Sequence, residues 1–269
     1  MKVTDIKRIP PPNSSYLEEM YNLQKELIKP YIGIEGLPEY PLDVDTKANQ
    51  ALLKDFISRI IEELGEAFQE FEKLYILALG GFENKLDAQQ ILSNFNEEIA
   101  DALHFFLELL IYLNIGPQDL DSYAQHIMGD INLNLEEEPL DNLLKISRHH
   151  NNTIGRNIYK AQSGYYVDVT GEDGFTIAGR KVGSEQIINY KVMLWETTYT
   201  LQLVRNELKN KPWTQTGTLT NTEVLQEKAV QSFLTFMMWL EYTGHTSQSI
   251  YTVYYKKNQV NQQRIKDKR

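Results

Sequence analysis

The chain has 269 residues, of which 42% are hydrophobic, and its formal net charge at pH 7 is −10. This length and apolar content are enough for a core in one or two domains. There is no cysteine, which excludes a disulfide framework and thiol chemistry and favours a reducing, cytoplasmic setting. The acidic balance disfavours nucleic acid as a partner, because affinity for phosphate backbones comes mainly from clustered Lys and Arg.

A membrane partner is not expected either. The N-terminal sequence MKVTDIKRIPPP lacks the apolar segment of a signal peptide. The longest apolar run, residues 103–113, is too short to span a bilayer and contains His104 and Glu108.

The first half of the chain predicts an extended arm followed by helices. Residues 1–15 should be extended, because Pro10-Pro11-Pro12 cannot lie inside a helix. Apolar residues then recur at helical spacing between Pro- and Gly-rich breaks. The helices expected from this pattern are 16–29, 45 or 46 to 79, 87–92, 94–113 and 118–128. Asn94, with Glu97 three residues later, is expected to cap the fourth of them.

The composition changes after residue 129. Residues 130–188 are rich in glycine and predict a connector or insertion, in which 165–170 and 175–178 form a small β-hairpin. Helical periodicity returns afterwards, at 189–209, 222–242 and 247–267. We therefore expect a helical unit at 1–129, the connector at 130–188 and a second helical unit at 189–269, which together form one compact functional domain.

A weak internal repeat relates the two helical units. Residues 97–113 resemble residues 226–242, and residues 60–67 resemble residues 193–200. In each alignment the second copy has lost one of the two acids. Chance similarity between amphipathic helices remains an alternative explanation.

Four acids in the first unit predict a metal site. Glu63 and Glu66 on one helix, and Glu98 and Asp101 on another, are spaced so that each pair shares a helix face. Antiparallel packing would bring the four carboxylates together, where their repulsion calls for a hard divalent cation. Mg²⁺ is the cation expected, with Mn²⁺ as a substitute. The alternative is that the acids of the first helix form a solvated face.

The C-terminal helix carries a second group of polar residues. Lys257, Asn261 and Arg264 are spaced by four and three, so they share one side of a helix and suit contacts with phosphate. An ordinary solvated terminal helix is the alternative. Gln24, on the first helix, is a candidate for reading a base edge.

These motifs resemble a known family. Glu62-Glu63-x-x-Glu66 followed by Glu98-x-x-Asp101 is similar to the E-E-x-x-E and E-x-x-D signature of the all-α NTP pyrophosphohydrolases, which include MazG-like enzymes and dimeric dUTPases. The run EIADALHFFLEL resembles the version found in dUTPases and in phage dCTPase-dUTPases. The terminal YYKKNQVNQQR resembles the K-N-x-x-N-x-x-R motif of that same branch.

The resemblance implies an all-α helical bundle with a degenerate second copy, assembled as a homodimer. It implies Mg²⁺-dependent hydrolysis of dUTP to dUMP and pyrophosphate by attack at the α-phosphate. A phage dCTP or dCTP/dUTP pyrophosphatase and a MazG-like NTP pyrophosphatase are alternatives. A rival of another class is a helical interaction module without enzymatic activity.

The resemblance also assigns roles to residues. The metal ligands it implies are Glu63, Glu66, Glu98 and Asp101. Either Glu63 or Glu66 would be the general base. The substrate-binding residues it implies are Gln24, Lys257, Asn258, Asn261 and Arg264.

Overall fold

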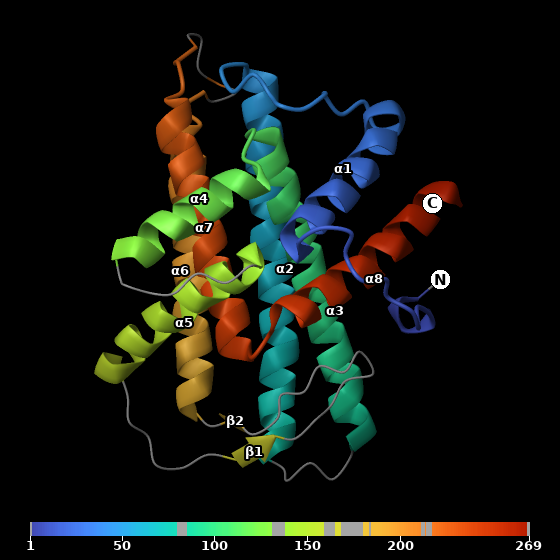
Figure 1. The fold of residues 1–269 in the computed structure, drawn as a ribbon, viewed down its shortest axis with the longest axis vertical. Coiled ribbons are helices and arrows are strands. Elements are labelled where there is room, and N and C mark those ends of the chain that lie inside the picture. The colour runs from blue at the N-terminus through green and yellow to red at the C-terminus, as the bar shows by residue number, and fades with distance from the viewer. Residues whose placement is uncertain are drawn as a thin grey trace.

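In the computed structural model the central element is an antiparallel pair of long helices, α2 (Lys47–Leu79) and α3 (Lys85–Tyr112). A second pair, α6 (Ser184–Glu207) and α7 (Thr222–Thr243), lies beside it (Figure 1). The structure describes residues 2–79, 85–130, 138–158, 165–167, 180–182, 184–210, 213 and 217–267. Within these ranges the chain is helical apart from two three-residue strands, which agrees with the all-α class that the sequence predicts.

Four further helices surround the two pairs. α4 (Pro117–Asp130) and α5 (Pro139–Ile158) cross in front of them in Figure 1, while α1 (Tyr16–Ile34) and α8 (Ser247–Lys266) lie together on the side where both termini are found. The N-terminal arm contains one 3-10 turn, Val3–Asp5, and is otherwise without regular structure up to α1.

The region expected to be a connector contains a helix that the sequence reading missed. α5 spans Pro139–Ile158 and packs against α4 and α7. Several of its buried residues follow helical spacing, among them Leu140, Leu143, Leu144 and Ser147. This apolar spacing is visible in the sequence, but the many glycines of 130–188 favoured the prediction of a connector. Two three-residue strands, β1 (Tyr165–Val167) and β2 (Arg180–Val182), pair antiparallel; residues 168–179, where the second arm of the hairpin was expected, lie outside the described residues.

The expectation of two separate helices at 87–92 and 94–113 is wrong, because α3 runs unbroken from Lys85 to Tyr112. A continuous buried stripe crosses the expected break: Ala88, Leu92, Phe95 and Ile99. The Asn94 side chain does not cap a helix. It accepts a hydrogen bond from Gln90 at 2.8 Å and donates to Glu70 on α2 at 3.4 Å.

Helix α1 begins as expected but ends later. The Ser15 hydroxyl accepts a hydrogen bond from the Glu18 amide at 3.2 Å, which confirms the predicted N-cap. The helix continues through Pro30 to Ile34, although proline removes one backbone donor. The additional turn brings Tyr31 and Glu35 to the pocket described below.

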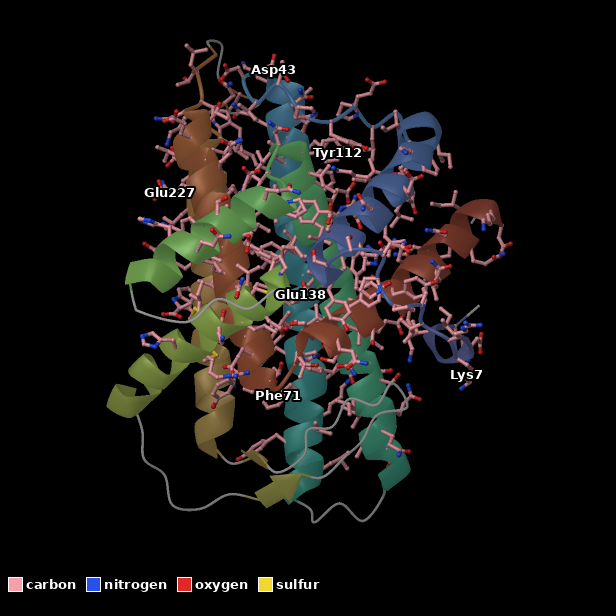
Figure 2. All side chains as sticks on the ribbon, viewed as in Figure 1. Lys7, Asp43, Phe71, Tyr112, Glu138 and Glu227 are labelled. Carbon is pink, nitrogen blue, oxygen red and sulfur yellow. The ribbon has the colours of Figure 1, made fainter. Side chains whose placement is uncertain are left out.

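Aromatic side chains pack within and between the helix pairs, and two of them, Phe71 and Tyr112, are labelled in Figure 2. Phe71 of α2 stacks on Tyr190 of α6 with ring centroids 3.6 Å apart. At the other end of the pair, Tyr112 stacks on Phe56 at 5.4 Å and donates a hydrogen bond to the Pro38 carbonyl. None of the described helices is by itself long and apolar enough to cross a membrane, although the bent pair Asp87–Tyr112 and Pro117–His126 meets the length and composition criteria together.

Candidate active site

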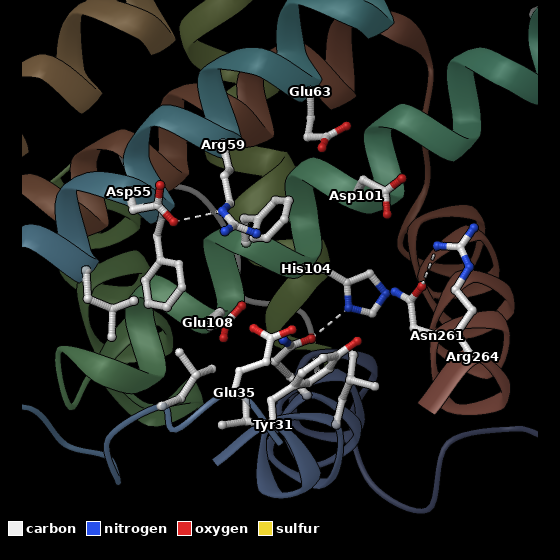
Figure 3. A pocket seen from close by; sticks show the side chains of 17 residues that line it. Tyr31, Glu35, Asp55, Arg59, Glu63, Asp101, His104, Glu108, Asn261 and Arg264 are labelled. Atoms are coloured by element: carbon white, nitrogen blue, oxygen red, sulfur yellow. Dashed lines mark hydrogen bonds and ion pairs between the residues drawn. The ribbon is translucent and has the colours of Figure 1, made fainter. Parts of the chain in front are cut away.

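A pocket of about 350 Å³ opens between α1, α2, α3 and α8 (Figure 3). Its volume lies within the range of small-molecule sites in proteins. Acids from α2 and α3 gather at one end, and residues of α8 border that end. The polar lining includes Gln24, Glu35, Asp55, Arg59, Glu63, Asp101, His104, Glu108, Asn261 and Arg264.

Three of the four predicted metal ligands converge. One carboxylate oxygen each from Glu63, Glu66 and Glu98 lies within 4.8 Å of the others. Burial, and then the charges of Asp101, Glu98 and Glu66, raise the pKa of Glu63 to about 8. The pKa of Glu98 is raised as well, by burial first and by the neighbouring carboxylates second. The cluster therefore carries more negative charge than its surroundings neutralise.

This donor set fits a hard divalent cation. Mg²⁺ prefers oxygen ligands, and it usually keeps several waters while one or two carboxylates and substrate phosphates hold it. Burial first, and the neighbouring carboxylates second, raise the pKa of Glu63 and Glu98, and a bound dication would offset both effects by favouring the charged carboxylates. Glu63, Glu66 and Glu98 are thus the residues that would hold the ion.

Asp101, the fourth predicted ligand, lies beside the cluster and already has a cationic partner. Lys257 Nζ is 2.6 Å from Asp101 Oδ2 and 2.7 Å from Glu97 Oε1. The sequence predicted that Glu97 takes part in a helix cap, and this is wrong. Instead, its ion pair with Lys257 joins α3 to α8. The lysine is buried, with only 4% of its surface exposed. It faces carboxylates here and does not line the pocket.

Gln24 lies in the pocket wall as the centre of a buried network. Its Oε1 accepts hydrogen bonds from His104 Nδ1 at 2.7 Å and from the Tyr254 hydroxyl at 2.8 Å. The His104 and Tyr254 rings stack with centroids 4.2 Å apart. Burial, aided by the charge of Lys257, lowers the pKa of His104 to about 3, so the imidazole is neutral. Because Oε1 is occupied twice, the amide nitrogen of Gln24 is the group left for a ligand.

The three remaining predicted residues divide into two kinds. Asn261 and Arg264 line the pocket, and Arg264 Nη1 donates to Asn261 Oδ1 at 3.2 Å. Asn258 is fully buried and donates to the Leu23 carbonyl at 3.3 Å, which fastens α8 to α1. We assign Asn258 a structural role in this conformation.

The sequence reading missed the far end of the pocket. Asp55, Arg59 and Glu63 follow one face of α2 at spacings of four, while Asp101 and Glu108 are seven residues apart on the facing side of α3. Two such faces in antiparallel contact form a continuous polar groove. The spacing was visible in the sequence. However, the prediction of a site from the sequence used only the acids spaced by three, and so left out Asp55 and Glu108.

The second helix pair has no comparable cluster of acids among its described residues. Glu227, aligned with Glu98, is exposed on the outer side of α7 (Figure 2). Where α6 meets α7, hydroxyl groups pair with each other: Thr200 bonds to Ser232 at 3.3 Å and to Thr235 at 3.0 Å. Glu227 therefore offers a matched control position for the acids of the pocket.

Comparison with known proteins does not assign the chain to a family. No family model matches it, and neither a curated protein nor a solved structure does. The case for a function therefore depends on the pocket and its residues.

Proposed function

We propose that the protein hydrolyses a pyrimidine deoxynucleoside triphosphate to the monophosphate and pyrophosphate, with Mg²⁺ as cofactor. One observation carries the proposal: Glu63 lines one end of a pocket large enough for a nucleoside, and its carboxylate lies within 4.8 Å of those of Glu66 and Glu98. The resemblance of the acidic and C-terminal motifs to the all-α NTP pyrophosphohydrolases points the same way.

The pocket residues have separate tasks in this reaction. Bound Mg²⁺ would neutralise phosphate charge and make a coordinated water more acidic. Glu63 or Glu66 would act as the general base that takes a proton from the attacking water. Arg264 and Asn261 border the acidic end and would contact phosphate oxygens.

Lys257 has a different task in the free protein. In the absence of ligand, its ammonium group forms ion pairs with Asp101 and Glu97 and neutralises part of their charge. A lysine ammonium has three donors, and the loss of either carboxylate to another cation would free it for a phosphate. Gln24 would contact the base through its free amide nitrogen.

We take dUTP as the first substrate to test, and dCTP as the second. The free amide of Gln24 is a donor suited to a carbonyl of either base, so it does not separate the two. A homodimer is the assembly we expect from the resemblance, and the solution mass will test it.

The deciding experiment is a panel of dNTPs with Mg²⁺ in which monophosphate and pyrophosphate are both measured. We expect turnover of dUTP, dCTP or both, and loss of at least 100-fold in kcat for Glu98→Ala, an effect typical of removing a central charge-stabilising group. Glu227→Ala is the matched control. It changes the aligned glutamate of the second helix pair, which is exposed and distant from the pocket, and should retain full activity.

Three results would contradict the proposal. Absence of turnover with every nucleotide would favour a helical interaction module. Equal activity of Glu98→Ala and Glu227→Ala would remove the acid cluster from the mechanism. Release of orthophosphate would show that the bond broken is not the one proposed.

A further inference from the structure

The end of the pocket away from the acid cluster has no role in the chemistry described so far. There the Glu108 carboxyl group points into the cavity from α3, opposite Tyr31 and Glu35 of α1 (Figure 3). It makes no hydrogen bond or ion pair with any described residue. Its neighbour Arg59 interacts with it electrostatically, while the Arg59 Nε donates to Asp55 at 2.8 Å and the guanidinium lies 5.5 Å from the centre of the Phe105 ring.

The position of Glu108 suits contact with a base. Asp101, at the acidic end, is seven residues from Glu108, which corresponds to about 10.5 Å along the helix axis. An extended nucleotide with its α-phosphate near the acid cluster would place its base at this depth. Phe105 and Leu52 also line the pocket and offer apolar surface for the faces of a ring.

We propose that the carboxyl group of Glu108 reads the hydrogen-bonding edge of the pyrimidine, and that it accepts cytosine and uracil alike. This inference rests on the proposed function and identifies the residue that sets its base preference. Gln24 would complete the recognition by donating to the O2 carbonyl, which both bases possess.

A neutral carboxyl group is complementary to both edges because it carries a donor and an acceptor side by side. With uracil, its carbonyl accepts from N3–H and its hydroxyl donates to O4. With cytosine, the carbonyl accepts from the N4 amino group and the hydroxyl donates to N3. A carboxylate has no donor to offer, so it satisfies only part of either edge.

The surroundings of Glu108 favour the neutral form. Burial raises its pKa to about 7; Arg59 on α2 opposes this rise, and Glu35 on α1 adds to it. Tyr31 on α1, Tyr112 on α3 and Tyr254 on α8 also interact electrostatically with Glu108. Asp55 on α2 and His104 on α3 line the same pocket, and Arg264 of α8 stands at its acidic end. A base stacked in the pocket would exclude more water and stabilise the neutral carboxyl further.

The test compares Glu108→Leu and Glu108→Gln with the unchanged protein. The substrates are dUTP, dCTP and 2-deoxyribose 5-triphosphate, which lacks a base. We expect Glu108→Leu to lose about 10- to 100-fold in kcat/KM for both nucleotides, mainly through KM, as is usual when buried hydrogen-bonding groups lose a partner. Activity on the base-free triphosphate should be unchanged, which also shows that the variant folds.

Glu108→Gln should stay within about fivefold of the unchanged protein for both nucleotides, because an amide also presents a donor beside an acceptor. A binding measurement separates this inference from the proposed function. We expect the binding of α,β-imido-dUTP, titrated calorimetrically, to weaken more steeply for the unchanged protein than for Glu108→Gln as pH rises from 6 to 9.

The outcomes distinguish the two proposals. If Glu108→Leu lowers activity on all three substrates equally, or leaves both nucleotides unaffected, Glu108 does not read the base, while the hydrolase proposal stands. If no substrate is turned over but the imido nucleotides bind in the manner described, the hydrolase proposal fails and base recognition by Glu108 stands. Identical pH dependence in the unchanged protein and Glu108→Gln would overturn the role of the neutral carboxyl.

Discussion

Replacing Glu63 by glutamine should stabilise the metal-free protein at alkaline pH. The pKa of Glu63 is about 8 in the folded chain, against 4.5 for a free glutamate. The folded state therefore binds more protons than the unfolded state between these values, and the free energy of unfolding falls as pH rises from 4.5 to 8. Above pH 8 the whole penalty is present, and the neutral amide of Glu63→Gln removes it.

The structure also sets the size of this effect. A pKa of 8 in place of 4.5 corresponds to at most about 5 kcal/mol, at 1.36 kcal/mol per pH unit. Glu63 is only half-buried, so water and salt screen its neighbours, and we expect about 1–2 kcal/mol. For a chain of this length that is a rise in Tm of about 2–8 °C.

Thermal unfolding followed by circular dichroism, in EDTA and in Mg²⁺, is the assay. In EDTA, Glu63→Gln should exceed the unchanged protein in Tm at pH 9 and match it near pH 5. In Mg²⁺ the advantage should shrink or reverse, because the unchanged protein gains the cation. Glu227→Gln, on the exposed face of α7, should follow the unchanged protein throughout. A gain for Glu63→Gln that is equal at pH 5 and pH 9 would refute the electrostatic reasoning.

Three further predictions concern the groups around the acid cluster. Without metal, Lys257→Met should lower the free energy of unfolding by about 1–3 kcal/mol, as measured by urea titration. This loss is smaller than for a fully buried ion pair, because the Glu97 side chain is 37% exposed. His104 should remain neutral down to about pH 3, so its NMR signals should not titrate between pH 5 and 8. The free energy of unfolding should decline as pH falls below about 6.5, because His104 takes up a proton in the unfolded chain but not in the folded one. Tyr254→Phe removes a donor to Gln24 and should cost about 1 kcal/mol, while raising KM for the nucleotide more than it lowers kcat.

Apolar periodicity was sufficient to predict most of the fold. The stripes of α2, α7 and α8 follow helical spacing closely, and capping residues such as Ser15 mark where helices begin. Errors arose where a local signal competed with packing. Asn94 is a good capping residue, but the buried stripe from Ala88 to Ile99 outweighs it, and the helix continues. Pro30 removes one backbone hydrogen bond from α1, but the helix continues past it because its buried apolar face still packs against its neighbours.

The candidate site was predictable in part, because i and i+3 spacing places acids on one helix face. That spacing was enough to predict the meeting of Glu63, Glu66 and Glu98. It gives no information on contacts between distant segments. The pairing of Lys257 with Glu97 and Asp101 joins residues about 160 positions apart, and the bond between His104 and Gln24 joins residues 80 apart. Such contacts depend on how α1 and α8 pack against α3.

The same packing explains why the acidic strip of α3 serves several purposes. At its start Glu98 joins the acid cluster; one turn later Asp101 holds Lys257 and thereby α8. A turn beyond that, His104 orients Gln24, and finally Glu108 reaches the far end of the pocket. Each step along the helix moves about 5 Å deeper into the pocket. The acids at the start suit a bound cation, whereas the Glu108 carboxyl group at the end favours its protonated form. A single helix face thus provides a gradient along which the phosphates and the base of one nucleotide would be distinguished.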